Sequence, residues 1–254
     1  MTRAERYRRA LEWFEQEMPE PQTELRYDSP FHLLLAVILS AQCTDKRVNM
    51  ITPPLFEAFP TPQSLADSDE PTVFEYIRSV SYPNNKTRSL LGAARKLVSD
   101  FNGEVPDNLD DLLTIPGVGR KTANVMLAVV WNRAAMAVDT HVFRVAERIG
   151  LTTGSRTPFE TEKALTANIP EEKIPRAHHW LILHGRYICK ARKPECENCG
   201  LTGFCRYYIT LQKEAEKKPA TAKTTATSKK TAAASKKTAA ASKKPATAKT
   251  KTSK

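Results

Sequence analysis

The sequence predicts an all-α protein, and three observations support this fold class. Apolar side chains recur every three or four residues through most of residues 1–212, which is the period of an amphipathic helix. Proline, glycine and asparagine stand between these segments, as they do between consecutive helices. No segment alternates apolar and polar residues in the way that a half-buried strand does.

The first helix is expected over residues 3–18, where five apolar side chains share one face. These are Tyr7, Ala10, Leu11, Phe14 and Met18. Ser29 is a capping residue, and Pro30 follows it at the first helical position. This pair predicts a helix over 31–41. Pro53 and Pro54 are expected to interrupt the stretch that follows, because proline cannot donate the helical hydrogen bond.

Six further helices are expected downstream. Residues 84–101 form a long amphipathic segment, which Asn102 and Gly103 should end because both residues adopt the left-handed conformation readily. The remaining five are predicted at 109–113, 119–132, 140–149, 159–168 and 175–188.

The net charge of +11 is concentrated near the C-terminus. Residues 213–254 hold thirteen lysines and two acidic residues, whereas residues 1–212 hold 26 basic and 26 acidic side chains. The basic balance of the whole chain therefore does not by itself indicate that the folded part binds nucleic acid.

Residues 213–254 are expected to form a disordered tail, because they contain no aromatic and no large aliphatic side chain to bury. The heptapeptide SKKTAAA occurs at 228–234 and again at 235–241. Two interpretations fit this composition: a solubilising segment without specificity, or a basic arm that tethers the protein to DNA.

Nothing in the sequence predicts a membrane protein. The first 18 residues are charged throughout, and the longest apolar run, Phe31–Leu39, is shorter than the roughly 20 residues that span a bilayer. We therefore expect a cytoplasmic protein. In that compartment the five cysteines favour metal binding or reactive thiols over disulfides.

Residues 109–131 read LDDLLTIPGVGRKTANVMLAVVW, which predicts two helices joined by a tight turn. Gly117 and Gly119 are expected to allow positive φ and a close approach of the backbone. The second helix begins directly after them, so its free N–H groups and the positive end of its dipole form a phosphate site. The alternative is an ordinary turn between two helices.

Four cysteines are spaced C-x6-C-x2-C-x5-C within seventeen residues: Cys189, Cys196, Cys199 and Cys205. Four soft thiolates this close together indicate a metal centre. Zinc is the alternative to iron, but zinc sites usually contain two short C-x2–4-C pairs and only one is present. Cys43 lies far from this set in an apolar helix end, where core packing is the expected role.

The string L-x-x-I-P-G-V-G-R-K-T-A resembles the helix–hairpin–helix signature of the endonuclease III family of base-excision DNA glycosylases. The resemblance extends over roughly residues 3–210 and includes four more stretches in the family's order. These are PFHLLLAVILSAQCTD, VDTHVFRV, HHWLILHGRYICKARKP and the cysteine set.

The resemblance implies two folded domains and a cofactor. Residues 22–134 would form a six-helix barrel that contains the hairpin. Residues 1–21 and 135–212 would form an iron–sulfur domain, followed by the tail at 213–254. The four cysteines named above would bind a [4Fe–4S] cluster.

The resemblance also implies two catalytic residues. Lys121 lies in the first turn of the second hairpin helix, where the dipole disfavours a cation and so favours the neutral amine that a nucleophile requires. Judged by position alone it is a phosphate contact, but bifunctional family members carry their catalytic lysine there. Asp139 precedes a helix and by itself is an N-cap worth about 1 kcal/mol. The resemblance makes it the carboxylate that helps to activate Lys121 and stabilises positive charge on the sugar.

Several DNA contacts follow from the same resemblance. Gln42 matches the residue that fills the gap left by a flipped-out base. Tyr82 stands where the family often has a leucine wedge, and its ring could intercalate by stacking on bases. His141 is either a DNA contact or a packed side chain. Phosphate contacts are expected without the resemblance, from the helix start at Gly117 and Gly119 and from the three cations of the loop after Cys189, which are Lys190, Arg192 and Lys193.

The implied activity is that of a bifunctional DNA glycosylase and abasic-site lyase. It would act on double-stranded DNA that carries a damaged base or an abasic site, removing oxidised pyrimidines and nicking the strand by β-elimination through a lysine Schiff base. We expect a monomer associated with the nucleoid. One alternative is a purine-lesion glycosylase of the same superfamily, because the adenine-removing relatives also tend to have tyrosine at the Tyr82 position. Another is a non-enzymatic nucleoid protein, against which the presence of both Lys121 and Asp139 argues.

Overall fold

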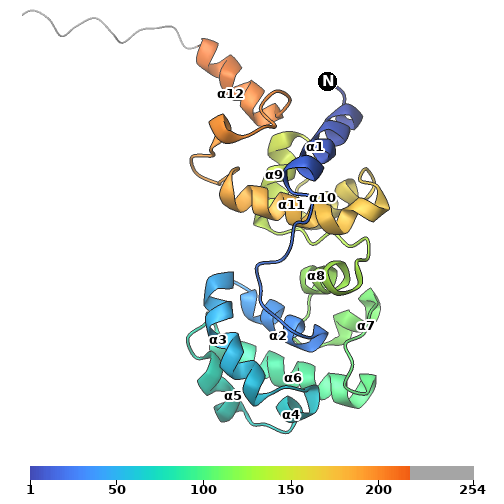
Figure 1. Ribbon diagram of the computed structural model, residues 1–254, viewed down its shortest axis with the longest axis vertical. Helices are drawn as coiled ribbons and strands as arrows, with labels where there is room; N and C mark the ends of the chain where they lie inside the picture. The colour runs from blue at the N-terminus through green and yellow to red at the C-terminus, as the bar shows by residue number, and fades with distance from the viewer. Residues whose placement is uncertain (218–254) are drawn as a thin grey trace, which may run out of the picture. The chain divides into compact units, whose positions relative to one another are not determined.

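The structure is a computed structural model and describes residues 1–217 (Figure 1). The described residues form twelve α-helices and two short 3₁₀ helices and contain no strand, which confirms the all-α prediction. The α-helices are α1 (Arg3–Glu17), α2 (Pro30–Ser40), α3 (Asp45–Ala58), α4 (Pro62–Ala66), α5 (Glu70–Ile77), α6 (Pro83–Phe101), α7 (Leu109–Thr114), α8 (Arg120–Trp131), α9 (Thr140–Ile149), α10 (Pro158–Thr166), α11 (Ile174–Tyr187) and α12 (Arg206–Lys217). The 3₁₀ helices are η1 (Glu171–Lys173) and η2 (Cys196–Asn198).

Helices α2 to α8 surround one hydrophobic core, which we call the barrel lobe. Helix α2 is its centre, since every residue from Phe31 to Leu39 is buried. Ser29 caps this helix by accepting a hydrogen bond from the His32 N–H at 3.1 Å, and Pro30 occupies the first helical position as expected. Helices α3, α6 and α8 pack against α2, so the hairpin helix α8 is anchored directly to the core.

A second core gathers α1, α9, α10, α11 and the cysteine segment, and we call it the cysteine lobe. Helix α1 contributes the apolar face expected from the sequence, with Tyr7, Ala10, Leu11 and Phe14 buried. It lies beside α11, although residues 18–173 separate these two helices in the sequence (Figure 1). The chain leaves the barrel core at Ala135 and enters the second core at Met136. Both lobes belong to the same compact unit, Met1–Ala215.

Helix α3 corrects one expectation, since it continues through Pro53 and Pro54 instead of being interrupted by them. Both prolines are exposed, so water can reach the carbonyl groups that they leave unpaired. The neighbouring Val48, Ile51 and Leu55 are buried in the barrel core. That burial outweighs the lost helical hydrogen bonds.

The other boundaries differ little from expectation, except near the C-terminus. Helix α6 ends at Phe101, and Asn102 and Gly103 follow with φ of 52° and 80°. Helix α12 extends to Lys217 and so includes the first five residues of the predicted tail, which are rich in good helix formers. The rest of that tail, 218–254, lies outside the described residues. None of the described helices is long and apolar enough to cross a membrane.

Candidate functional site

The turn between α7 and α8 has one conformationally demanding glycine. Gly117 has φ of 82°, and a Cβ atom at that position would lie 2.6 Å from the Ser89 Cβ. Gly119 instead has extended backbone, with φ of −98°, and a Cβ atom there would meet nothing within 4 Å. The expectation of positive φ therefore holds for Gly117 and is wrong for Gly119.

Gly119 is the N-cap of α8, and no side chain caps this helix end. The first N–H groups of an α-helix have no partner inside the helix and carry the positive end of its dipole. Because the surface beside Gly119 is open, an anion could approach these groups closely.

Lys121 and Asp139 line the same pocket, although they come from different lobes. Lys121 is exposed in the first turn of α8, and Asp139 directly precedes α9. Thr23, from the segment that joins the lobes, and His178, from α11, also line this pocket. We call it the Lys121 pocket. The lobes thus bring an amine and a carboxylate into one shared space.

Asp139 also caps a helix, as its sequence position predicts. Its Oδ1 accepts hydrogen bonds from the backbone N–H groups of His141 and Val142, both at 2.8 Å. Capping and a role in the pocket are compatible, because the two bonds immobilise a carboxylate that still lines the cavity.

Two histidines of α11 line the Lys121 pocket as well, and the sequence motifs do not single them out. Burial lowers the pKa of His178 to about 3, and burial together with the nearby Arg186 lowers the pKa of His179 to about 4. Both imidazoles are therefore neutral at pH 7. They add polar atoms to the pocket without adding positive charge beside Lys121.

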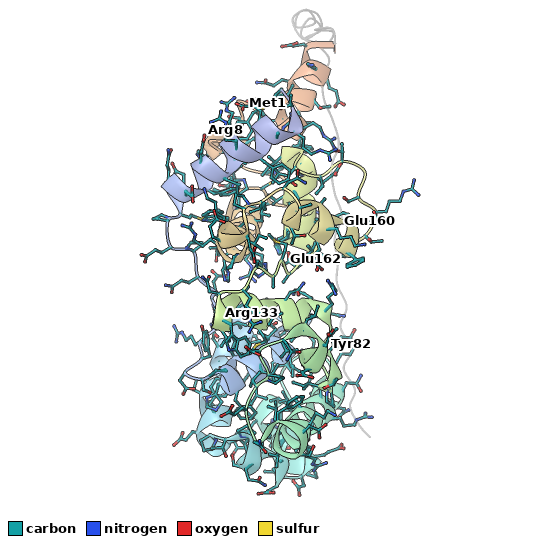
Figure 2. All side chains as sticks on the ribbon, turned by 90° about the vertical axis from the view of Figure 1, so that its right-hand side faces the viewer. Met1, Arg8, Tyr82, Arg133, Glu160 and Glu162 are labelled. Carbon is teal, nitrogen blue, oxygen red and sulfur yellow. The ribbon has the colours of Figure 1, made fainter. Side chains whose placement is uncertain are left out.

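Ion pairs connect the two lobes. In the lining of the pocket, Arg186 of α11 donates to the carboxylates of Glu24 and Asp45. A second link between the lobes joins two residues that do not line the pocket: Arg120, next to Lys121, donates to Glu162 of α10 with a shortest distance of 2.7 Å. Figure 2 labels Glu162 on the cysteine lobe. Each link reaches far along the chain, and no local motif predicts it.

The two candidates for insertion into DNA are both exposed residues with left-handed backbone. Gln42 follows α2 with φ of 53°, and Tyr82 precedes α6 with φ of 56°. Tyr82 is 61% exposed and lies on the surface of the barrel lobe (Figure 2). The Ser81 hydroxyl donates to the Gln42 carbonyl oxygen at 2.8 Å, so the two loops are adjacent.

His141 is half-buried where α9 and α11 pack closely. A Cβ atom on Gly185 would lie 2.8 Å from the His141 Cβ, and the His141 Nδ1 lies 3.2 Å from Nη2 of Arg144. These contacts favour the packing interpretation, although His141 is not fully buried.

The four cysteines of the motif line one small pocket with apolar walls that include Ile149 and Leu201. Two arginines of α9 brace this segment. Arg144 donates to the Cys189 carbonyl oxygen at 3.1 Å, and Arg148 donates to the Lys190 carbonyl oxygen at 2.7 Å. Arg148 also lies 3.6 Å from the Cys189 Sγ. Four soft donors around one enclosed space suit an iron–sulfur cluster.

No group of three or more His, Cys, Asp or Glu side chains within residues 1–217 is arranged to hold a single metal ion. Cys43 lies elsewhere, partly buried against the barrel core as expected. In the loop between Cys189 and Cys196, Lys190, Arg192 and Lys193 are all exposed, and Lys190 forms an ion pair with Glu195.

Two family models match the chain. Residues 35–171 match the HhH-GPD superfamily base excision DNA repair protein, and residues 189–205 match the iron–sulfur binding domain of endonuclease III. The second match contains all four motif cysteines and identifies their cofactor as an iron–sulfur cluster.

Individual relatives agree with these models. Endonuclease III of Rickettsia felis is 47% identical over 198 residues, which cover 78% of this chain and 92% of that protein. Endonuclease III of Escherichia coli K12 is 43% identical, covering 74% of this chain and 89% of that protein. A solved endonuclease III trapped as a covalent intermediate with DNA is 40% identical with a TM-score of 0.79, covering 84% of this chain and all of that one. The chain therefore belongs to the endonuclease III family of the HhH-GPD superfamily.

Proposed function

We propose that the chain is a base-excision repair enzyme that removes oxidised pyrimidines from double-stranded DNA and then nicks the strand. The observation that carries this proposal is the pocket that Lys121 and Asp139 share, although they come from different lobes. The relative that was trapped as a covalent intermediate with DNA supports a covalent mechanism for the family.

The first chemical step is cleavage of the glycosidic bond. The damaged nucleotide turns out of the duplex into the Lys121 pocket. The lone pair of the Lys121 Nζ then attacks C1′ of the deoxyribose, and the bond from C1′ to the base breaks with its electrons leaving on the base. Asp139 stabilises the positive charge on the sugar and accepts the proton that the amine releases.

The second step nicks the strand. Opening of the sugar ring gives a Schiff base between Nζ and C1′, which makes the C2′ proton acidic. When that proton is lost, the C3′–O bond breaks and the 3′ phosphate leaves with the electron pair. Water then hydrolyses the imine and restores the free amine of Lys121.

We propose that DNA contacts surround this pocket. The open N-terminus of α8 after Gly119 would bind phosphate through its N–H groups. Gln42 and Tyr82 would occupy the space left by the flipped nucleotide, with His141 on the opposite lobe. Lys190 and Arg192 would contact phosphate beside the cluster. We also propose that the enzyme acts as a monomer at the nucleoid, and that domains 22–134 and 1–21 with 135–212 correspond to the two lobes.

The cluster has a direct test in its own ligands. A Cys199→Ser variant is expected to lose its iron and its visible absorbance, because one of the four soft donors is replaced. The unmodified protein should hold about four iron atoms per chain, measured by metal analysis. Cys43→Ser is the matched control and should keep full iron content. An unmodified protein that is colourless and holds zinc without iron would contradict the assignment.

Lesion choice is tested by base release from two matched duplexes, one containing thymine glycol and one containing a mispaired adenine. We expect release and nicking at thymine glycol, with adenine released at least about 100-fold more slowly. Faster adenine release without nicking would instead indicate the purine-lesion enzyme. Binding with no nicking even at a pre-formed abasic site would indicate the non-enzymatic nucleoid protein.

A further inference from the structure

Gln42 and Tyr82 share an unusual backbone conformation. Both are non-glycine residues with left-handed φ, 53° and 56°, and they lie on adjacent loops of the barrel lobe. A residue with a Cβ atom is disfavoured in that conformation, so contacts in the surrounding structure must hold it there. Lys86 makes two of these contacts, both at the end of α2.

Lys86 is a buried cation in the first turn of α6, with only 6% of its surface exposed. Its Nζ donates to the carbonyl oxygens of Leu39 at 2.8 Å and Ala41 at 2.7 Å, which are at the end of α2. Its backbone N–H donates to the Tyr82 carbonyl oxygen at 3.1 Å. The side chain of Lys86 thus ties the start of α6, which Tyr82 precedes, to the end of α2, which Gln42 follows, whereas its backbone bond to Tyr82 is the first helical hydrogen bond of α6.

The chemistry of the α2 end explains why a lysine is suited to this position. The last carbonyl groups of a helix lack intrahelical partners and carry the negative end of its dipole. A buried ammonium group needs acceptors, and its charge-assisted hydrogen bonds are stronger than those of a neutral donor. The chain must turn sharply at Gln42, directly after these carbonyls. The Ser81 hydroxyl adds a third link, to the Gln42 carbonyl oxygen at 2.8 Å.

We propose that Lys86 is a positioning residue that sets the Gln42 and Tyr82 loops in their DNA-inserting conformation before DNA binds. This inference rests on the proposed function, which assigns both residues to the gap beside the flipped nucleotide. A loop that is already ordered loses less entropy on binding. This saving in entropy should matter only for binding to duplex DNA. In a single strand, flipping the nucleotide out leaves no gap opposite a complementary strand for Gln42 and Tyr82 to fill.

The test compares borohydride trapping rates on a duplex and on a single-stranded oligonucleotide that carry the same abasic site. Lys86→Met should slow trapping on the duplex at least about tenfold, the loss expected from about one hydrogen bond to a charged group. Trapping on the single strand should stay within about twofold of the unmodified enzyme. Ser81→Ala removes only the third link and should reduce the duplex rate about threefold, with the same selectivity.

Lys96→Met, on the same helix but paired with Asp100 at the surface, is the matched control and should change neither rate. An equal loss on both substrates, or no loss on the duplex, would overturn the positioning role. If Lys86→Met does not fold, Ser81→Ala decides by the same two criteria. Failure of the unmodified enzyme to trap either substrate would instead refute the proposed function, so the two failures are distinguishable.

Discussion

A Lys121→Ala variant is expected to form no borohydride-trapped complex with abasic DNA. Trapping requires a Schiff base, and alanine has no amine to form one. Strand nicking should fall by at least about 10³-fold, because removal of a nucleophile eliminates the covalent route and leaves only background chemistry. Stability should change little, since Lys121 is an exposed residue. The measurement is gel separation of the cross-linked species after borohydride treatment.

Lys121→Arg distinguishes the nucleophile from a phosphate contact. Arginine keeps the positive charge and can bind phosphate, but its guanidinium does not form a Schiff base with the sugar. We expect this variant to bind an uncleavable abasic analogue nearly as well as the unmodified protein, but to form no trapped complex with a natural abasic duplex. Trapping or nicking at full rate by either variant would show that Lys121 only contacts phosphate.

Local sequence patterns are sufficient to predict most of this fold. The Ser29–Pro30 start and the Asn102–Gly103 end depend only on neighbours in the chain, and both are confirmed. The expected interruption of α3 is wrong because the effect of Pro53 and Pro54 depends on burial of the surrounding face, which a local rule does not contain. The short helices α4 and α5 are not predicted, whereas the equally short α7 is, because α7 stands in the string that predicts two helices joined by a tight turn.

The Lys121 pocket is predictable only in part. Lys121 and Asp139 stand in short strings that resemble a known family, so the sequence alone is enough to name them. His178 and Arg186 cannot be assigned to the pocket in the same way, because their places depend on how α11 packs across the other lobe. The position of the Lys86 side chain is even harder to predict from the sequence. Lysine is normally exposed, and nothing near it in the sequence indicates that its side chain ends beneath α2.

Asp139→Asn is expected to separate the two roles of this carboxylate. Asparagine caps helices about as well as aspartate, so the bonds to the His141 and Val142 N–H groups can persist. The loss of negative charge at the start of α9 should lower Tm by no more than about 4 °C. Base release should nevertheless fall by roughly 10²-fold or more, because the side chain no longer carries a charge or accepts a proton from Lys121.

Asp69→Asn provides the same chemical change outside the pocket. Asp69 caps α5 by accepting a hydrogen bond from the Thr72 N–H at 2.9 Å, and it is not among the residues that line the Lys121 pocket. It should show a comparable small change in Tm with full activity. If Asp139→Asn behaved like Asp69→Asn, its carboxylate would be a cap and nothing more, and Lys121 would need another residue to take its proton. Loss of activity together with a large drop in Tm would also argue against a catalytic role, since unfolding alone would then account for the result.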